Sequence, residues 1–217
     1  MATANKEHII KNYNRLSLWY DTIAAGSEKN LRLAGLRQLN ATAGETILEI
    51  GFGTGHSLLE IAEAVGNSGK AYGIDISNRM LDIAKGRAAA AGYGERIELQ
   101  CADALNLLFI AKNFDGLFMS FTLEVFSPLD VGPFLQQCWK VVKMSGRMCV
   151  VAMSIEGKHG MMMKLYEWAH KKFPNTVDCR PISAKELIGA NGFDVIEDTM
   201  MSFWGLSVEI VRSTKHQ

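Results

Sequence analysis

Three glycines at the end of a short apolar run are the residues best placed to bind a ligand. The segment ILEIGFGTGHS begins at Ile47 and places Gly51, Gly53 and Gly55 at alternate positions. Because glycine lacks Cβ, it adopts positive φ and lets a ligand lie against the backbone. A dinucleotide fingerprint would need a glycine where His56 stands. The spacing therefore favours a smaller adenosyl ligand over a pyrophosphate.

Three acids lie at or just beyond the ends of apolar runs. Glu49 lies one residue before the end of the first run, where a carboxylate is costly unless it meets an ammonium, such as that of an amino-acid-bearing cofactor. Asp75 ends a second run 24 residues after Gly51, where a carboxylate accepts hydrogen bonds from both hydroxyls of a ribose. Asp103 follows a third run, either as a solvated turn acid or within reach of an adenine amino group.

The elements that position these residues are strands alternating with helices. Amphipathic spacing, as at Leu58, Ile61, Ala62 and Val65, predicts helices between the apolar runs. Such alternation predicts a mainly parallel, doubly wound α/β sheet with helices on both faces. In such a sheet the ligand binds outside the carboxyl ends of the strands. The expected strands cover residues 46–50, 70–76, 96–101, 114–120, 147–153, 193–198 and 207–213.

Composition narrows the function classes. Lysine plus arginine and aspartate plus glutamate both number 23, so no net charge draws the chain to nucleic acid or to an anionic membrane. The four cysteines lack the spacing of a zinc site, so we expect no metal, and they fit free thiols in a reducing cytoplasm. Residues 1–217 are expected to form one domain, as a monomer or homodimer, with no secretion signal.

The order of these motifs resembles a known family. ILEIGFGTG, GIDIS, CADAL, FDGLFMSFTLEVF and WKVVKMSGRMCVV, within about residues 40 to 155, are similar to the class I S-adenosylmethionine-dependent methyltransferases. Within them, YNRLSLWYD, Ser120-Phe121 and GFDVIED resemble the ubiquinone/menaquinone-biosynthesis C-methyltransferase group. The resemblance implies S-adenosyl-L-methionine as cofactor and a Rossmann-like sheet of seven strands with an antiparallel last strand.

The resemblance also implies roles for individual residues. Asp75 would contact the ribose, Asp103 the adenine edge and Ser120 the methionyl part, while Tyr20 would close the site from the N-terminal helix. The remaining cofactor contacts would come from the glycine turn and from the residues around the adenine: Gly51, Gly53, Thr54, Gly55, Ile76, Met80 and Ala104.

Two departures from the family pattern bear on the substrate. The usual lysine-proline-glycine-glycine turn is Lys143-Met144-Ser145-Gly146 here, a change that should affect little beyond a turn. The asparagine-rich segment expected after Ser120 is replaced by residues 122–125, TLEV, in the region where substrate meets the methyl group. This second change leaves the acceptor open between a quinone-precursor-like and a lipid-like molecule.

The acceptor side offers several candidates. A general base would come from Glu124, His8, His159, His170 or Asp178. Arg180 either binds an anionic group of the substrate or pairs with Asp178. We expect residues 1–40 to form a helical cover and residues 155–182 a lid insertion, whose amphipathic segment 160–173 either binds a lipophilic acceptor, with peripheral membrane contact, or packs on the sheet.

Two other functions share these features. A nicotinamide-dependent oxidoreductase would use the same kind of sheet and ribose acid, but the glycine spacing differs from its phosphate turn. A non-catalytic module could keep the fold and the cofactor site, because fold does not fix function. The expected partner of the leading hypothesis is a small-molecule substrate, hydrophobic or aromatic.

Overall fold

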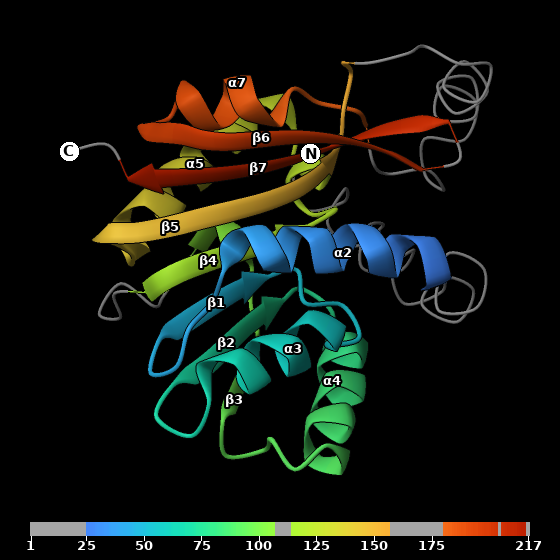
Figure 1. Ribbon diagram of the computed structural model, residues 1–217, viewed down its shortest axis with the longest axis vertical. Helices are drawn as coiled ribbons and strands as arrows, with labels where there is room; N and C mark the ends of the chain where they lie inside the picture. Colours follow the sequence, from blue (N-terminus) through green and yellow to red (C-terminus); the bar gives the residue numbers. More distant parts are fainter. Residues whose placement is uncertain (1–24, 107–113, 157–179, 204, 216–217) are drawn as a thin grey trace.

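The computed structural model describes residues 25–106, 114–156, 180–203 and 205–215 (Figure 1). Seven strands and five α-helices, with two short 3₁₀ helices, make up this part of the chain. In chain order they are α2 (Ala25–Leu39), β1 (Thr46–Ile50), α3 (His56–Val65), β2 (Lys70–Asp75), α4 (Asn78–Ala90), β3 (Ile97–Cys101), η1 (Ala104–Asn106), β4 (Phe114–Ser120), η2 (Leu123–Val125), α5 (Pro128–Val141), β5 (Val142–Met153), α7 (Ala184–Gly189), β6 (Phe193–Phe203) and β7 (Leu206–Lys215).

The strands form one sheet in the order β3-β2-β1-β4-β5-β7-β6. The pairs from β3 to β5 are parallel, whereas β7 runs antiparallel to both β5 and β6. The predicted seven-stranded, mainly parallel sheet with an antiparallel last strand is therefore confirmed. Because β1 lies between β2 and β4, the chain leaves β1 in one direction and returns on its other side, which opens a crevice at the carboxyl ends of these strands.

Helices cover both faces of the sheet, as predicted. In Figure 1, α2 and α3 lie in front of the sheet and α5 lies behind it. On the front face α3 buries Leu58, Ile61, Ala62 and Val65, the stripe that the sequence indicated. Behind the sheet, α5 and α7 bury Phe134 and Ile188 in a second apolar core. Two apolar layers thus hold the strand ends in fixed positions.

Two strands extend beyond their predicted bounds. β6 runs to Phe203, because it pairs with β7 along its whole length. β5 begins at Val142 and includes residues 143–146, which we had expected to form a turn. Phe114 pairs with Val142 and Gly116 with Arg147, so these four residues stand opposite a single residue of β4. The expected turn is therefore a bulge inside the strand.

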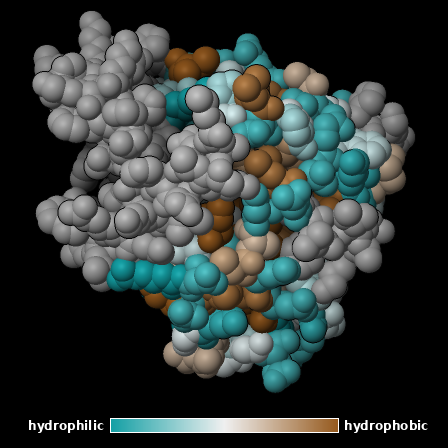
Figure 2. All heavy atoms as spheres, turned by 180° about the vertical axis from the view of Figure 1, so that it is seen from behind, coloured by the Kyte–Doolittle hydropathy of each residue, from teal (hydrophilic) through white to brown (hydrophobic). Residues whose placement is uncertain are grey.

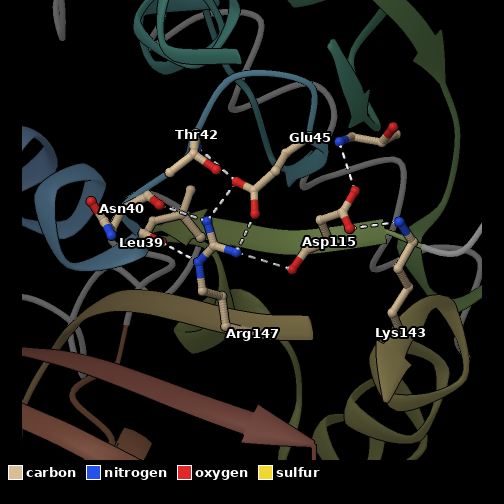
Figure 3. A network of polar contacts seen from close by, with 8 residues as sticks. Leu39, Asn40, Thr42, Glu45, Asp115, Lys143 and Arg147 are labelled. Carbon is tan, nitrogen blue, oxygen red and sulfur yellow. Dashed lines mark hydrogen bonds and ion pairs between the residues drawn. The ribbon is translucent and has the colours of Figure 1, made fainter. Parts of the chain in front are cut away.

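A polar network around Arg147 holds the end of the sheet that lies opposite the carboxyl ends of the parallel strands (Figure 3). Its guanidinium donates to both carboxylate oxygens of Glu45, at 2.8 and 2.7 Å, and to the carbonyl oxygens of Leu39 and Asn40 at the end of α2. Asp115 accepts a hydrogen bond from the backbone N–H of Thr46 at 2.9 Å. These contacts join α2, β1, β4 and β5 away from the crevice.

Replacement of Arg147 by methionine is expected to lower the free energy of unfolding by about 2 kcal/mol, because Glu45 and two carbonyl groups lose their shared donor. Chemical denaturation measures this loss. Lys143→Met is the control, since its ion pair with Asp115 is more exposed and should contribute less than about 1 kcal/mol. Equal losses in the two variants would contradict the structural role of Arg147.

Several large apolar side chains are exposed on the described surface. They lie on α5, β5, β6 and the residues after β5: Leu129, Met144, Ile155, Ile196 and Met200. On the face opposite to that of Figure 1, hydrophilic and hydrophobic residues are interspersed (Figure 2). Among the described helices, none has the length and apolar character needed to span a membrane.

Candidate functional site

The candidate site lies at the carboxyl ends of β1 to β4, here called the carboxyl edge. After β1 the chain turns through Gly51, Gly53 and Gly55, with φ angles of +74°, +51° and +83°. Gly51 donates to the carbonyl of Ile74 on β2 and Gly55 to that of Phe52, both at 2.8 Å. A Cβ on Gly53 would meet no atom of the described residues within 4 Å. The turn therefore presents open backbone at Gly53, as a ligand cradle requires.

Asp75 connects the glycine turn to the end of β2. Its Oδ2 accepts the backbone N–H of Gly53 and its Oδ1 that of Ser77, both at 2.9 Å. Burial raises the pKa of this carboxyl, while those backbone hydrogen bonds oppose the rise. Each carboxylate oxygen has a second lone pair, so Asp75 is able to accept two ligand hydroxyls while it holds the turn.

The predicted adenine residues lie beside Asp75. Ala102 donates to the carbonyl of Asp75 at 2.9 Å, which places Asp103 next to the end of β2. Ser77 caps α4 by accepting the N–H of Met80 at 3.2 Å. The predicted residues in this group are Ile76, Met80, Asp103 and Ala104, of which Met80 is buried and the other three are half-buried. One carboxylate oxygen of Asp103 accepts a hydrogen bond from the backbone N–H of Leu105, so Asp103 also stabilises the local turn.

Glu49 is buried at the end of β1, with 2% of its surface exposed. Burial raises its pKa to about 8, against a hydrogen bond with Ser57 and the positive charge of Arg32. Within the described part of the chain, Oε2 is buried and lacks a hydrogen-bond partner. A buried carboxylate oxygen without a donor is costly, so this atom fits the ammonium group of a ligand.

Arg32 is a site residue that the sequence did not reveal. It lies on α2, and its Nη1 is buried without a hydrogen-bond partner among the described residues. Burial lowers its pKa, while Glu49, Glu60 and Glu28 act in the opposite direction. A cation and an anion with one unpartnered atom each thus lie close to the glycine turn. The two charges match the carboxylate and the ammonium of an amino acid.

Two further contacts fix the glycine turn. Arg87 of α4 donates to the carbonyl oxygen of Thr54 at 2.5 Å. Thr122 follows β4 and donates to the carbonyl of Ser120 at 3.1 Å. A Cβ on Gly51 would lie 2.3 Å from Oγ1 of Thr122. The segment after β4 therefore packs directly against the glycine turn and brings Ser120 to the carboxyl edge.

Of the three predicted catalytic residues, Glu124 and Arg180 lie within the described structure, both at η2. Glu124 is buried in η2, and its Oε1 accepts the N–H of Met153 at 3.2 Å. Arg180 donates to the carbonyl of Phe126 at 3.2 Å, beyond η2. The other predicted residues of the acceptor side lie outside the described part of the chain: Tyr20, His8, His159, His170 and Asp178, the proposed partner of Arg180. Most of the predicted lid at 155–182 lies outside it as well.

The sequence comparisons agree with this geometry. Residues 47–146, from β1 into β5, match the family described as a methyltransferase domain. The demethylmenaquinone methyltransferase of Desulfitobacterium hafniense (strain Y51) is 29% identical over 171 residues, which cover 77% of this chain and 67% of the relative. That of Oceanobacillus iheyensis is 30% identical, over 68% of this chain and 61% of the relative. The chain thus spans about two thirds or less of these relatives.

Solved structures show the same fold. Magnesium protoporphyrin IX methyltransferase from Synechocystis PCC 6803, solved with bound S-adenosylhomocysteine, superposes with a TM-score of 0.73 at 15% identity, over 99% of this chain and 100% of that one. The 1,6-didemethyltoxoflavin-N1-methyltransferase of Burkholderia thailandensis gives 0.73 at 16% identity, over 100% and 89%. At such identities the likeness concerns the fold, not the acceptor.

Proposed function

We propose that this chain, which belongs to the class I S-adenosylmethionine-dependent methyltransferases, transfers a methyl group at the carboxyl edge to a small hydrophobic or aromatic acceptor. Its cofactor is S-adenosyl-L-methionine. When bound, this cofactor supplies an electrophilic methyl group on a sulfonium. The relatives named above methylate demethylmenaquinone, and a quinone precursor is one acceptor in the proposed class.

The observation that supports the proposal most strongly is the set of unsatisfied polar atoms around the glycine turn. Oε2 of Glu49 and Nη1 of Arg32 match the two charges of an amino acid. Asp75 lies on the other side of the same turn, where its carboxylate suits the two hydroxyls of a ribose. A nucleoside joined to an amino acid satisfies all three residues, whereas a nicotinamide dinucleotide supplies no ammonium group to Oε2 of Glu49.

The residues of the chain would act mainly by positioning. Glu49 and Arg32 hold the amino-acid end, Asp75 holds the ribose, and Ile76, Met80, Asp103 and Ala104 enclose the adenine. Ser120, the last residue of β4, lies between this cradle and the end of β5. Holding donor and acceptor in line supplies much of the rate enhancement of such a displacement without a catalytic triad.

The direct test is transfer of a labelled methyl group from S-adenosylmethionine to a panel of hydroxylated naphthalenes that includes a short-chain demethylmenaquinol. We expect a methylated product together with micromolar binding of S-adenosylhomocysteine. Binding without any product across the panel would favour a non-catalytic module. Thermal stabilisation by NADH but not by S-adenosylhomocysteine would instead support the oxidoreductase alternative.

Binding of S-adenosylhomocysteine is expected to release protons at pH 7. With a pKa of about 8, the free Glu49 is mostly protonated at this pH, and it must ionise to pair with the ligand ammonium. Calorimetry in buffers of different ionisation enthalpy measures the release, which should be somewhat below about one proton. Glu49→Gln should abolish the release and weaken binding about tenfold or more. Unchanged proton release in that variant would exclude Glu49 as the group that ionises.

A further inference from the structure

The acceptor side of the site contains a second buried carboxylate with an unused oxygen. Glu124 is 1% exposed, and while its Oε1 accepts the N–H of Met153, its Oε2 lacks a hydrogen-bond partner among the described residues. The free energy cost of leaving a buried carboxylate oxygen without a donor falls when a ligand supplies one. Within the described chain, Glu28 of α2 is the charge that acts on Glu124, and it is also negative.

An apolar cluster adjoins this carboxylate. Phe121 packs against Met153 at the end of β5 and Leu206 at the start of β7, both of which are buried. Phe121 has a φ of +52°, which is uncommon for a bulky side chain, and its N–H donates to the carbonyl of Val151 at 2.8 Å. Since the backbone hydrogen bond holds this conformation, the ring is fixed beside Met153.

The order of the strands places this apolar cluster beyond β4, on the side of the cofactor site where an acceptor would face the methyl group. The cradle for the nucleoside lies over β1, β2 and β3, and the strands beyond β4 are β5, β7 and β6. Thr122 packs against the glycine turn, and two residues later Glu124 reaches the end of β5. The segment 120–124 therefore extends from the cofactor cradle to the apolar cluster. An acceptor that faces the methyl group would lie over β4 and β5.

We propose that Phe121, Met153, Leu206 and Glu124 form the acceptor subsite, which binds a small aromatic molecule whose hydroxyl donates a hydrogen bond to Oε2 of Glu124. This inference rests on the proposed function and specifies its acceptor as a hydroxylated aromatic. The Phe121 ring and the Met153 thioether suit an aromatic face, because thioether–aromatic and ring–ring contacts are favourable. The lone carboxylate oxygen selects for the hydroxyl.

The test compares 1-naphthol with 1-methoxynaphthalene, in which a methoxy group replaces the donating hydroxyl, on protein saturated with S-adenosylhomocysteine. Wild-type protein should bind the naphthol at least about tenfold more tightly than the ether, as measured by quenching of tryptophan fluorescence. In Glu124→Leu the ratio should fall to about one, and in Glu124→Gln to a few-fold. Phe121→Ala is the matched control, which should weaken both probes and keep their ratio.

Affinity for S-adenosylhomocysteine and the thermal unfolding midpoint are measured on each variant and separate this proposal from the preceding one. If the wild type does not bind S-adenosylhomocysteine, the cofactor site itself is wrong. If it does, three results overturn the acceptor subsite: no binding of either probe, equal binding of both, or a ratio that survives in the Glu124 variants. If Glu124→Leu does not fold, Glu124→Gln decides, because it has nearly the same shape.

Discussion

Replacement of Asp75 by alanine is expected to weaken binding of S-adenosylhomocysteine at least about 100-fold, which corresponds to roughly 2.7 kcal/mol. Two ribose hydroxyls would lose an ionised acceptor, and each such hydrogen bond contributes about 1.5 to 3 kcal/mol. The backbone N–H groups of Gly53 and Ser77 would also lose their partner, so the turn itself would loosen. Isothermal titration calorimetry measures the change.

Asp82→Ala provides the matched control for this loss of one negative charge. Asp82 is exposed on α4, the helix that follows Asp75. Its replacement should leave the affinity unchanged within about twofold, because an exposed charge contributes little. Similar affinities for Asp75→Ala and the wild type, in protein that remains folded, would exclude Asp75 from the site.

Gly53→Ala is expected to reduce cofactor affinity at least about 30-fold while the protein remains folded. Its Cβ would project into space that the described residues leave open, next to Asp75, where we place the ligand. The substitution also introduces a non-glycine residue at a φ of +51°, which costs about 1 to 2 kcal/mol of stability. Calorimetry and chemical denaturation separate these two effects.

Gly66→Ala reproduces the backbone effect away from the site. Gly66 ends α3 with a φ of +65° and a ψ of −165°, and a Cβ there would meet no described atom within 4 Å. Because this backbone region is essentially restricted to glycine, the stability should fall by at least as much as in Gly53→Ala, yet the cofactor affinity should remain that of the wild type. If both glycine variants lose affinity equally, the loss at Gly53 reflects general destabilisation rather than contact with the ligand.

Local sequence patterns were sufficient to predict the positions of the strands and of the glycine turn. The apolar runs that end at Ile50 and Asp75 are the strands β1 and β2, and the Ser77 hydroxyl caps the helix that follows β2. These features depend on residues that are close in the chain, such as the Ser77 hydroxyl and the N–H of Met80. Together with helix periodicity they were enough to predict a doubly wound sheet.

Features that depend on packing between distant segments were missed. Nothing in the sequence around Arg32 distinguishes it from Arg37 on the same polar helix, and only the docking of α2 brings its guanidinium near Glu49. The bulge at residues 143–146 resembles an ordinary turn in sequence, because it arises from the pairing of Val142 and Arg147 with β4. Likewise, the burial of Glu124 depends on the end of β5.

The central claim is that the glycine turn, with Asp75 on one side and Glu49 with Arg32 on the other, binds the nucleoside and the amino acid of the cofactor. A crystal structure with S-adenosylhomocysteine tests it most directly. We predict ribose hydroxyls within hydrogen-bond distance of Asp75, the ammonium at Oε2 of Glu49 and the carboxylate at Nη1 of Arg32. Density for the ligand at any place other than the carboxyl edge would contradict the account.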